Sequence, residues 1–519
     1  MHTAVLRGID PIPVVVEVDV ASGLPGFTLV GLPDSSVKEA RERVFAAIKH
    51  AGFSIPPRRI TINLAPADWR KEGSAFDLPM ALALLAASGQ VQIDALQDWI
   101  IAGELSLDGH LRAIRGALSL ALHAQRENFR GILLPSVNAA EASLVESLRV
   151  LSAGHLRQAI QVLQNPSEAM RPPHATSPSG LAGREVYPDF RDLRGQFLAR
   201  RALEVAAAGG HHFVFIGSPG CGKTMMARRV PGILPPMNQG EALEATCIYG
   251  CAGLLPKEGG LITQRPFRQP HHTASAHALV GGGPKLRPGE ASLAHHGLLF
   301  LDEWPEFHRA ALESLRQPLE DGYVQLSRVA GTVRFPSRFI LGAAMNPCPC
   351  GYLFDSVKAC TCSPEEIARY RRRISGPMLD RMDLHIEVPR LEMANLLRTD
   401  PGEATAALRG RVEKAREIQW ERYRSQAGVE CNARMGVQEI RKHAQLDGAC
   451  RKLLVDAISR LGLSARAYDR ILKVARTLAD LEGVVDLREE HLAEAISYRS
   501  LDKSLAKMDS NSLTMTSSS

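Results

Sequence analysis

The fold is decided by residues 212–230, which read HFVFIGSPGCGKTMMARRV. An apolar run leads into the pattern G-x4-G-K-T, and residues that can form a helix follow it. Glycines at this spacing let backbone N–H groups turn towards phosphate oxygens, and the N-terminus of the next helix adds partial positive charge. The stretch therefore predicts a strand, a phosphate loop and a helix, as in a P-loop α/β domain that binds ATP. We expect eight consecutive residues to contact the nucleotide: Gly217, Ser218, Pro219, Gly220, Cys221, Gly222, Lys223 and Thr224.

A second segment supplies carboxylates for such a domain. Residues 298–303 read LLFLDE, four apolar residues of a buried strand followed by two acids. Doubly wound sheets bind ligands at the carboxyl edge of their strands. We expect Thr224 and Asp302 to hold Mg²⁺ at this edge. Lys223 would reach the β- and γ-phosphates, and Glu303 would polarise the attacking water.

A third strand is expected in residues 339–347, FILGAAMNP, and it ends at Asn346. An amide at the same sheet edge can orient the attacking water near the γ-phosphate. The simpler alternative is that Asn346 forms a turn before Pro347.

Length and composition limit the class of protein. A chain of 519 residues is too long for one core, so two or three domains are expected. Apolar residues make up 45% and charged residues 23%, which is ordinary for a water-soluble globular protein. The formal net charge of +6 permits an anionic partner without demonstrating one. No signal peptide and no apolar run long enough to span a membrane is seen, which predicts a cytoplasmic protein.

Hydrophobic periodicity divides the chain into parts. Residues 1–165 and 190–390 alternate strand and helix patterns, and residues 391–502 are helical in pattern. Pro, Ser and Gly dominate residues 166–189. We expect strands in the first part near 14–20, 60–64, 99–102 and 131–134, with helices near 36–51, 78–88 and 116–126. The predicted parts are residues 1–165, a linker 166–189, an ATPase core 190–390, a helical lid 391–502 and a disordered tail 503–519.

Four of the nine cysteines lie close together in residues 346–362, NPCPCGYLFDSVKACTC. Four thiolates can close a tetrahedral Zn²⁺ site around a hairpin loop. The C-x-C spacing is tighter than the usual C-x2-C, so redox-active thiols and inert buried cysteines remain alternatives. The candidate zinc ligands are Cys348, Cys350, Cys360 and Cys362.

The order of the phosphate loop, LLFLDE, AAMNP and residues 377–388, PMLDRMDLHIEV, resembles an AAA+ ATPase of the clade that contains magnesium-chelatase ATPase subunits and MCM helicases. The resemblance implies that Arg381 acts across a subunit interface, with Met382 in place of the usual aromatic residue. A guanidinium from a neighbour stabilises the charge that develops on the transferred phosphoryl group. The alternative is an ion pair within the chain, with Asp380 or Asp383.

The same clade has a sensor arginine in its helical lid. Residues 463–481, LSARAYDRILKVARTLADL, resemble that segment, and the resemblance places the role on Arg466. Arg470 and Arg476 lie on related faces of the same helix and are the alternatives.

Two further segments are similar to DNA-handling elements of this clade. Residues 265–297 resemble a helix-2 insertion that faces the pore of a ring. We expect this segment to be basic and polar, owing to Arg265, Arg268, His271, His272 and Lys285. Residues 322–339, GYVQLSRVAGTVRFPSRF, predict two short strands and resemble a hairpin that points basic residues at DNA. Arg328 and Arg334 would be those residues; the alternative is a plain structural hairpin.

The first part of the chain resembles the proteolytic domain of Lon-type proteases, in residues 70–88 and 103–121. That domain uses a serine and a lysine as a catalytic dyad. Here the serine position is Ala75 and the lysine position is Leu118, and Ser74 next to the first position has no lysine to activate it. We therefore expect the Lon-like fold without peptidase activity, in a role in ring assembly or DNA binding.

Over roughly residues 1–502 the chain resembles the YifB/ComM family of magnesium chelatase-like proteins. The specific motifs are PGFTLVGLPDSSVKEARERV, RPFRQPHHTASAHALVGGG and NPCPCG. The resemblance implies a homo-oligomer, with a hexamer expected, that acts as a branch-migration helicase on DNA in natural transformation, with recombination proteins as further partners. The rival functions are a protein remodeller and a metal-insertion ATPase of the magnesium-chelatase type.

Overall fold

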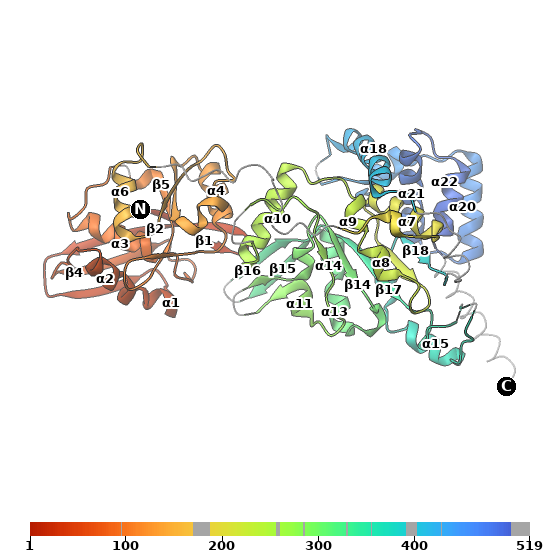
Figure 1. Ribbon diagram of the computed structural model, residues 1–519, viewed down its shortest axis with the longest axis horizontal. Helices are drawn as coiled ribbons and strands as arrows, with labels where there is room; N and C mark the ends of the chain where they lie inside the picture. The colour runs from red at the N-terminus through yellow and green to blue at the C-terminus, as the bar shows by residue number, and fades with distance from the viewer. Residues whose placement is uncertain are drawn as a thin grey trace.

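The computed structural model of the chain describes residues 1–94, 96–169, 187–255, 260–283, 286–328, 331–353, 355, 357–390, 402–426 and 428–499. Most of the expected linker 166–189 and the whole expected tail 503–519 lie outside these ranges. The molecule is elongated, with an α/β part at one end, a second α/β part in the middle and helices at the other end (Figure 1). Within the described ranges, no helix has both the length and the apolarity that a membrane crossing requires.

The N-terminal part is built on a seven-stranded mixed sheet in the order β3-β4-β2-β1-β5-β8-β9. The long strand β2 pairs antiparallel with β1 and β4, whereas the other neighbours are parallel. Alternate side chains of β2 and β4 are buried, as expected for strands with one face against a core. The strands are β1 (His2–Arg7), β2 (Asp10–Ala21), β3 (Gly26–Val30), β4 (Arg59–Ala65), β5 (Trp99–Ile101), β8 (Gly131–Pro135) and β9 (Arg149–Ala153).

The four strands expected in this part are confirmed as β2, β4, β5 and β8, and the structure adds β1, β3 and β9. β3 lies at the sheet edge with alternate residues exposed, so it lacks the apolar run that identifies a buried strand. The expected helices are also present, and α3 is buried along most of its length. The main helices are α2 (Ala40–His50), α3 (Asp77–Ala87), α4 (Ala117–Arg126) and α6 (Leu156–Gln164).

The central part contains a five-stranded parallel sheet in the order β11-β14-β17-β10-β18. Three of its strands are buried at every residue, which explains their continuous apolar sequences. Parallel strands place their carboxyl ends along one edge, so residues that follow β10, β14 and β17 come together. The strands are β10 (Phe213–Ile216), β11 (Phe267–Arg268), β14 (Leu298–Leu301), β17 (Ile340–Met345) and β18 (Leu384–Glu387).

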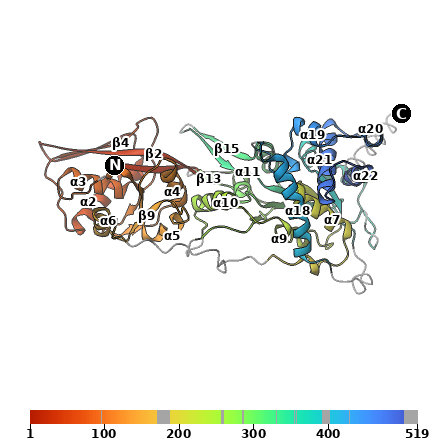
Figure 2. The same ribbon diagram turned by 90° about the horizontal axis from the view of Figure 1, so that it is seen from above.

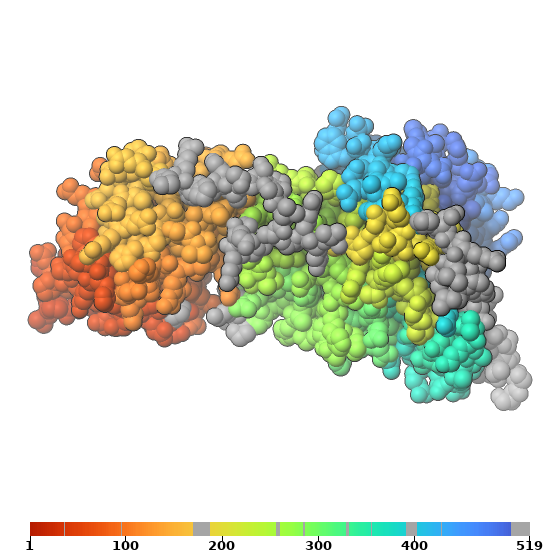
Figure 3. Space-filling view, in the orientation of Figure 1, coloured from red at the N-terminus to blue at the C-terminus, as the bar shows by residue number. Residues whose placement is uncertain are grey.

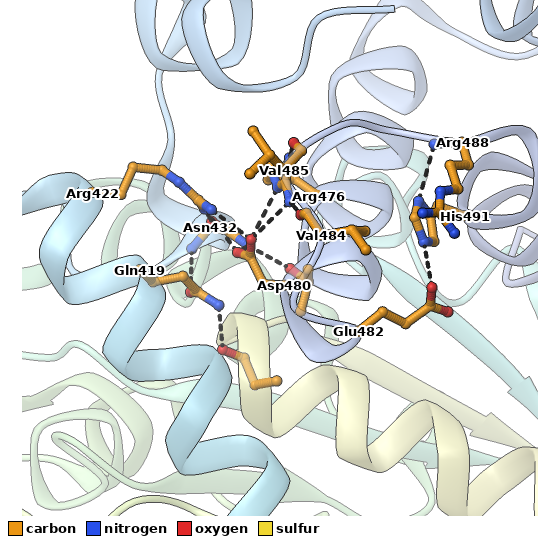
Figure 4. A network of polar contacts seen from close by, with 12 residues as sticks. Gln419, Arg422, Asn432, Arg476, Asp480, Glu482, Val484, Val485, Arg488 and His491 are labelled. Carbon is orange, nitrogen blue, oxygen red and sulfur yellow. Dashed lines mark hydrogen bonds and ion pairs between the residues drawn. The ribbon is translucent and has the colours of Figure 1, made fainter.

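The C-terminal helices pack against α7 (Phe197–Gly209), which precedes the core sheet. Their buried polar centre is Asp480, which accepts hydrogen bonds from Arg422, Arg476 and Asn432 (Figure 4). Pairing with two guanidinium groups compensates for burial of this carboxylate. The helices of this region are α18 (Thr405–Tyr423), α19 (Val437–His443), α20 (Gly448–Leu461), α21 (Ala465–Leu481) and α22 (Glu489–Ser497).

Among the described residues, the N-terminal part contacts the central part through α4 and through the turn between β1 and β2. Helix α4 packs on α10 (Gln239–Ala252), where Ser119 Oγ lies 4.0 Å from Cys251 Sγ. At the second place the β1–β2 turn reaches the hairpin of β15 (Tyr323–Arg328) and β16 (Gly331–Pro336), and a Cβ on Gly8 would lie 2.3 Å from Val333. Seen from above, β15 extends towards the N-terminal part (Figure 2). The N-terminal part is therefore anchored next to the hairpin that was expected to meet DNA.

Four histidines whose pKa values are lowered in the folded chain predict acid sensitivity of the central part. Burial lowers the pKa of His212 to about 3 and of His295 to about 4, and it also lowers the pKa values of His211 and His385. The unfolded chain, with histidine pKa values near 6.5, binds more protons below that pH, so stability present above it is lost as pH falls. Each such histidine lowers the free energy of unfolding by about 1.4 kcal/mol for each pH unit below its unfolded pKa. Thermal unfolding should therefore occur at a clearly lower temperature at pH 5.5 than at pH 7.5, and equal melting temperatures would contradict the assignment.

Candidate nucleotide site

The phosphate loop joins β10 to α8 (Lys223–Ala227) at the carboxyl edge of the sheet. Gly220 and Gly222 have φ values of +80° and +92°, which favour glycine. Gly217 has a different reason, because a Cβ there would lie 2.3 Å from the Val388 carbonyl oxygen. The loop thus has the backbone shape and the helix N-terminus that a phosphate group requires.

Lys223 and Asn346 meet inside this loop. The Lys223 ammonium donates to the carbonyl oxygens of Gly217 at 2.6 Å and Ser218 at 3.0 Å, and to Asn346 Oδ1 at 3.1 Å. Burial lowers the pKa of Lys223. The expected water-orienting amide and the expected phosphate-binding ammonium therefore lie on the same small site, and the contact favours a polar role for Asn346 over a plain turn.

Thr224 and Asp302 are also in direct contact. The Thr224 hydroxyl donates to Asp302 Oδ2 at 2.6 Å, and the backbone N–H of Glu303 donates to Asp302 Oδ1 at 3.0 Å. A hydroxyl and a carboxylate at this separation, beside a phosphate loop, match the ligands that P-loop enzymes give Mg²⁺. The donor set therefore fits Mg²⁺ bound with a nucleotide.

Glu303 projects from the end of β14 in the left-handed backbone region, with φ of +52°. Its carboxylate is 60% exposed, and Oε2 lies 3.0 Å from His272 Nδ1. This partner of Glu303 was not predicted. His272 follows β11, and the contact depends on β11 pairing with β14, which no spacing in the sequence reveals.

Arg381 lies in the segment between α16 (Gly376–Leu379) and β18 and is 6% exposed. Its guanidinium donates to the Pro377 carbonyl oxygen at 2.6 Å and pairs with Glu320. The ion pair considered from the sequence was with Asp380 or Asp383, but among the described residues Arg381 pairs with Glu320, and Asp383 pairs with Arg470. Burial lowers the pKa of Arg381, and nearby arginines lower it further.

Of the three arginines on α21, Arg466 alone is exposed, and its charge is close enough to act on Arg381. Arg470 is held by Asp383 and by the carbonyl oxygen of Arg381. Arg476 is 2% exposed and bonds Asp480 and the carbonyl oxygens of Val484 and Val485, as Figure 4 shows. Arg470 thus ties α21 to the segment before β18, Arg476 serves the packing of the helical region, and Arg466 is the exposed arginine of the three.

Two arginines of the expected pore insertion have internal partners. Arg265 is mostly covered and pairs with Glu241 at 3.1 Å, and Arg268 pairs with Glu290 at 2.6 Å. The first pair ties the insertion to α10 and the second lies within the insertion, so both charges are compensated, which corrects the expectation that these two arginines make it basic. Lys285 lies outside the described residues.

The β15–β16 hairpin predicted around residues 330 and 331 is present. Arg334 donates to Gln325 Oε1 at 3.1 Å and lies 4.8 Å over the Tyr323 ring. This places an exposed guanidinium and an aromatic ring on one face of the hairpin. The side chain of Arg328 is not described.

The four clustered cysteines converge after Asn346. Cys348 Sγ lies 3.3 Å from Cys350 Sγ, and each lies 3.6 Å from Cys360 Sγ. Disulfide sulfurs are about 2.05 Å apart, whereas a tetrahedron with Zn–S bonds of about 2.3 Å places sulfurs about 3.8 Å apart. All four sulfurs lie within 4.8 Å of one another, and the N–H of Cys350 donates to Cys362 Sγ. The donor set therefore fits Zn²⁺ and not a pair of disulfides.

A second cluster, Glu244 with His295 and His296, has a different character. Both Nε2 atoms approach the same oxygen of Glu244, at 3.0 and 2.9 Å. The Nδ1 atom of His295 accepts the N–H of Arg338, so a neutral ring carries its proton on Nε2 and donates it to Glu244. The contacts therefore assign hydrogen bonds that tie α10 to the segment before β14.

The expected dyad positions of the N-terminal part are structural. The carbonyl oxygen of Ala75 accepts the N–H of Gly103, and Leu118 is fully buried in α4. Ser74 donates to Glu104, which is not a base of the kind that a Ser–Lys dyad provides.

Comparisons with known proteins agree with this architecture. Residues 189–396 match the family magnesium chelatase, subunit ChlI, residues 16–138 match subunit ChlI of Mg-chelatase, and residues 402–499 match its C-terminal family. The chain is 45% identical to the uncharacterized protein YifB of Salmonella typhimurium over 97% of both chains. It is 45% identical to the competence protein ComM of Haemophilus influenzae over 98% of both. A shorter match, 28% identical over 166 residues, covers 31% of this chain and 30% of Lon protease 2 of Bacillus subtilis.

Proposed function

Because the chain belongs to the YifB/ComM family of magnesium chelatase-like proteins, we propose that it is an ATP-driven ring motor that moves branches in DNA recombination intermediates during natural transformation. The ATPase half of this proposal is carried by one observation. At the sheet edge formed by the ends of β10, β14 and β17, Lys223 contacts Asn346 and Thr224 contacts Asp302.

In the proposed site the phosphate loop binds ATP, and Thr224 and Asp302 hold Mg²⁺, which neutralises charge on the phosphates. Lys223 contacts the β- and γ-phosphates once the nucleotide displaces its present carbonyl partners. Glu303 accepts the proton of the attacking water, and Asn346 orients that water. His272, 3.0 Å from Glu303, holds the carboxylate until the nucleotide is in place.

The assembly is a homo-oligomeric ring, for which we propose six subunits. Each site then receives Arg381 from the neighbouring subunit, and Arg466, whose charge acts on Arg381, would join it there. The five parts predicted from the sequence, from the Lon-like domain to the C-terminal tail, are retained in this proposal. We also propose that the protein acts in the cytoplasm, where ATP and recombining DNA are present. Recombination proteins would be its partners there.

The DNA half rests on the relationship to a protein named for competence and on the hairpin of β15 and β16. Proteins that bind single-stranded nucleic acid contact phosphates with basic side chains and stack bases on aromatic rings. Arg334 and Tyr323 offer these two groups on one face of the hairpin. A protein remodeller remains the second candidate, because part of the chain is similar to Lon protease 2 of Bacillus subtilis. ATPase stimulation by branched DNA but not by an unfolded protein separates the two, and stimulation by the unfolded protein alone would replace the DNA proposal.

Arg334→Ala is expected to weaken binding of branched DNA and to make it less salt-dependent. Each phosphate contact that is lost lowers the slope of log affinity against log salt by roughly 0.7–0.9. Fluorescence anisotropy with a labelled junction, at several salt concentrations, measures both effects. The matched control is Arg441→Ala, an exposed arginine on α19, far from the hairpin in sequence. Equal affinities and slopes for both variants would assign the hairpin a structural role only.

A further inference from the structure

The loop that carries the four cysteines lies against the phosphate loop. It begins directly after Asn346, whose amide contacts Lys223. Between the two cysteine pairs, a Cβ on Gly351 would lie 2.6 Å from the Pro219 ring, so the loop backbone packs directly on the phosphate loop. The segment through α15 (Pro364–Arg371) projects at the edge of the molecule, below the C-terminal helices (Figure 3).

A third contact comes from Asp355. Its side chain is fully covered, and Oδ1 accepts the N–H groups of Val357 and Lys358. The bond from Val357 and the nearby Ser218 side chain lower the pKa of Asp355. Arg390 approaches the same carboxylate at 3.9 Å. Asp355 therefore joins the turn at the loop tip to a residue of the phosphate loop.

The stability of the closed conformation of residues 348–362 depends on whether a metal ion joins the four cysteines. Thiols are weak hydrogen-bond donors and acceptors, so four neutral sulfurs contribute little to holding residues 348–362 closed. A metal ion bound by four thiolates closes the loop. The free energy of metal binding then stabilises the folded conformation of the residues between the ligands. Two of the residues between the ligands, Gly351 and Asp355, lie against Pro219 and Ser218 of the phosphate loop.

We propose that the four-cysteine loop is a zinc-dependent clamp on the phosphate loop, so that Zn²⁺ at Cys348, Cys350, Cys360 and Cys362 raises affinity for the nucleotide. This proposal rests on the proposed nucleotide site. Because coupling between two sites is reciprocal, bound nucleotide must raise zinc affinity by the same factor. A coupling of about 10-fold lies within the usual range.

The test uses the full-length protein and the fluorescent nucleotide mant-ADP. Zinc content is measured by mass spectrometry, and zinc is then removed with a mercurial reagent and a chelator and restored after thiol is added back. We expect one zinc per chain, an affinity about 10-fold weaker without it, recovery on restoration, and slower zinc release when ADP is present. Unchanged mant-ADP affinity in the zinc-free protein would overturn the clamp, and so would a purified protein that contains no zinc.

Two variants separate the clamp from the folding of the loop. Asp355→Ala leaves all four cysteines in place and should retain one zinc per chain, yet bind mant-ADP several-fold more weakly, because the carboxylate beside Ser218 is lost. Val357→Ala changes an exposed side chain of the same loop and should alter neither quantity. Wild-type affinity in Asp355→Ala would contradict the proposal. A chain that binds no mant-ADP with zinc present would instead refute the nucleotide site itself.

Discussion

Glu303→Gln is expected to lower ATP hydrolysis by roughly 10²–10⁴-fold, the usual contribution of a general base. The change keeps the size and the hydrogen-bonding capacity of the side chain but removes the group that accepts a proton. The contacts among Thr224, Asp302 and Lys223 do not involve this side chain, so nucleotide affinity should change little. Phosphate release and mant-ATP binding measure the two quantities.

The control is Glu306→Gln, three residues along the chain, whose carboxylate pairs with Arg373 at the surface. Hydrolysis by this variant should match the wild type. If Glu303→Gln retained most of its hydrolysis, another base would act and the role assigned to Glu303 would be wrong.

Arg381→Ala is expected to lower hydrolysis by about 10³–10⁵-fold, as for other arginines that stabilise the transferred phosphoryl group. The site in the same chain would still bind nucleotide, because the arginine comes from a neighbour. Its present partner, Glu320, is half-exposed and can release it when an interface forms. Glu320→Gln should therefore leave hydrolysis largely intact, which separates the function of Arg381 from its local ion pair.

Subunit mixing tests where Arg381 acts. Lys223→Ala lacks the phosphate-binding ammonium and Arg381→Ala lacks the guanidinium, so each ring alone should be inactive. In an equal mixture, about a quarter of the interfaces in a closed ring combine an intact site with an intact arginine, and hydrolysis should reappear. Mixed rings that form, as shown by differently tagged subunits, and yet remain inactive would place Arg381 outside the interface mechanism.

Much of the core was predictable because its signals are local. The phosphate loop, the apolar strand of LLFLDE and the strand before Asn346 can each be recognised from a few consecutive residues. Parallel pairing then brings their ends together without further information. The hairpin around residues 330 and 331 was predicted for the same reason, from two short strands and a turn.

The missed features depend on contacts between distant segments. The pairing of His272 with Glu303 needs β11 beside β14, and the ion pairs of Arg265 and Arg268 need α10 and α12 (Glu290–Leu293) in place. A basic residue in a polar segment looks available in the sequence until its acidic partner is positioned. The edge strand β3 was missed because it buries too little to show an apolar run.

The contact of the cysteine loop with the phosphate loop was also beyond the sequence. The four cysteines indicated a metal site, and their distances fit one. Nothing in their spacing showed that the residues between the pairs lie on Pro219 and Ser218. That position connects two features that the sequence presented as separate.

The central claim is that ATP hydrolysis drives movement on branched DNA, and strand displacement from a synthetic four-way junction tests it most directly. The reaction contains ATP, Mg²⁺ and a labelled strand, with Glu303→Gln as the control that binds but cannot hydrolyse. The account predicts that the wild type displaces the labelled strand and that the variant only binds the junction. A wild-type protein that hydrolyses ATP, is not stimulated by DNA and leaves the junction intact would contradict it.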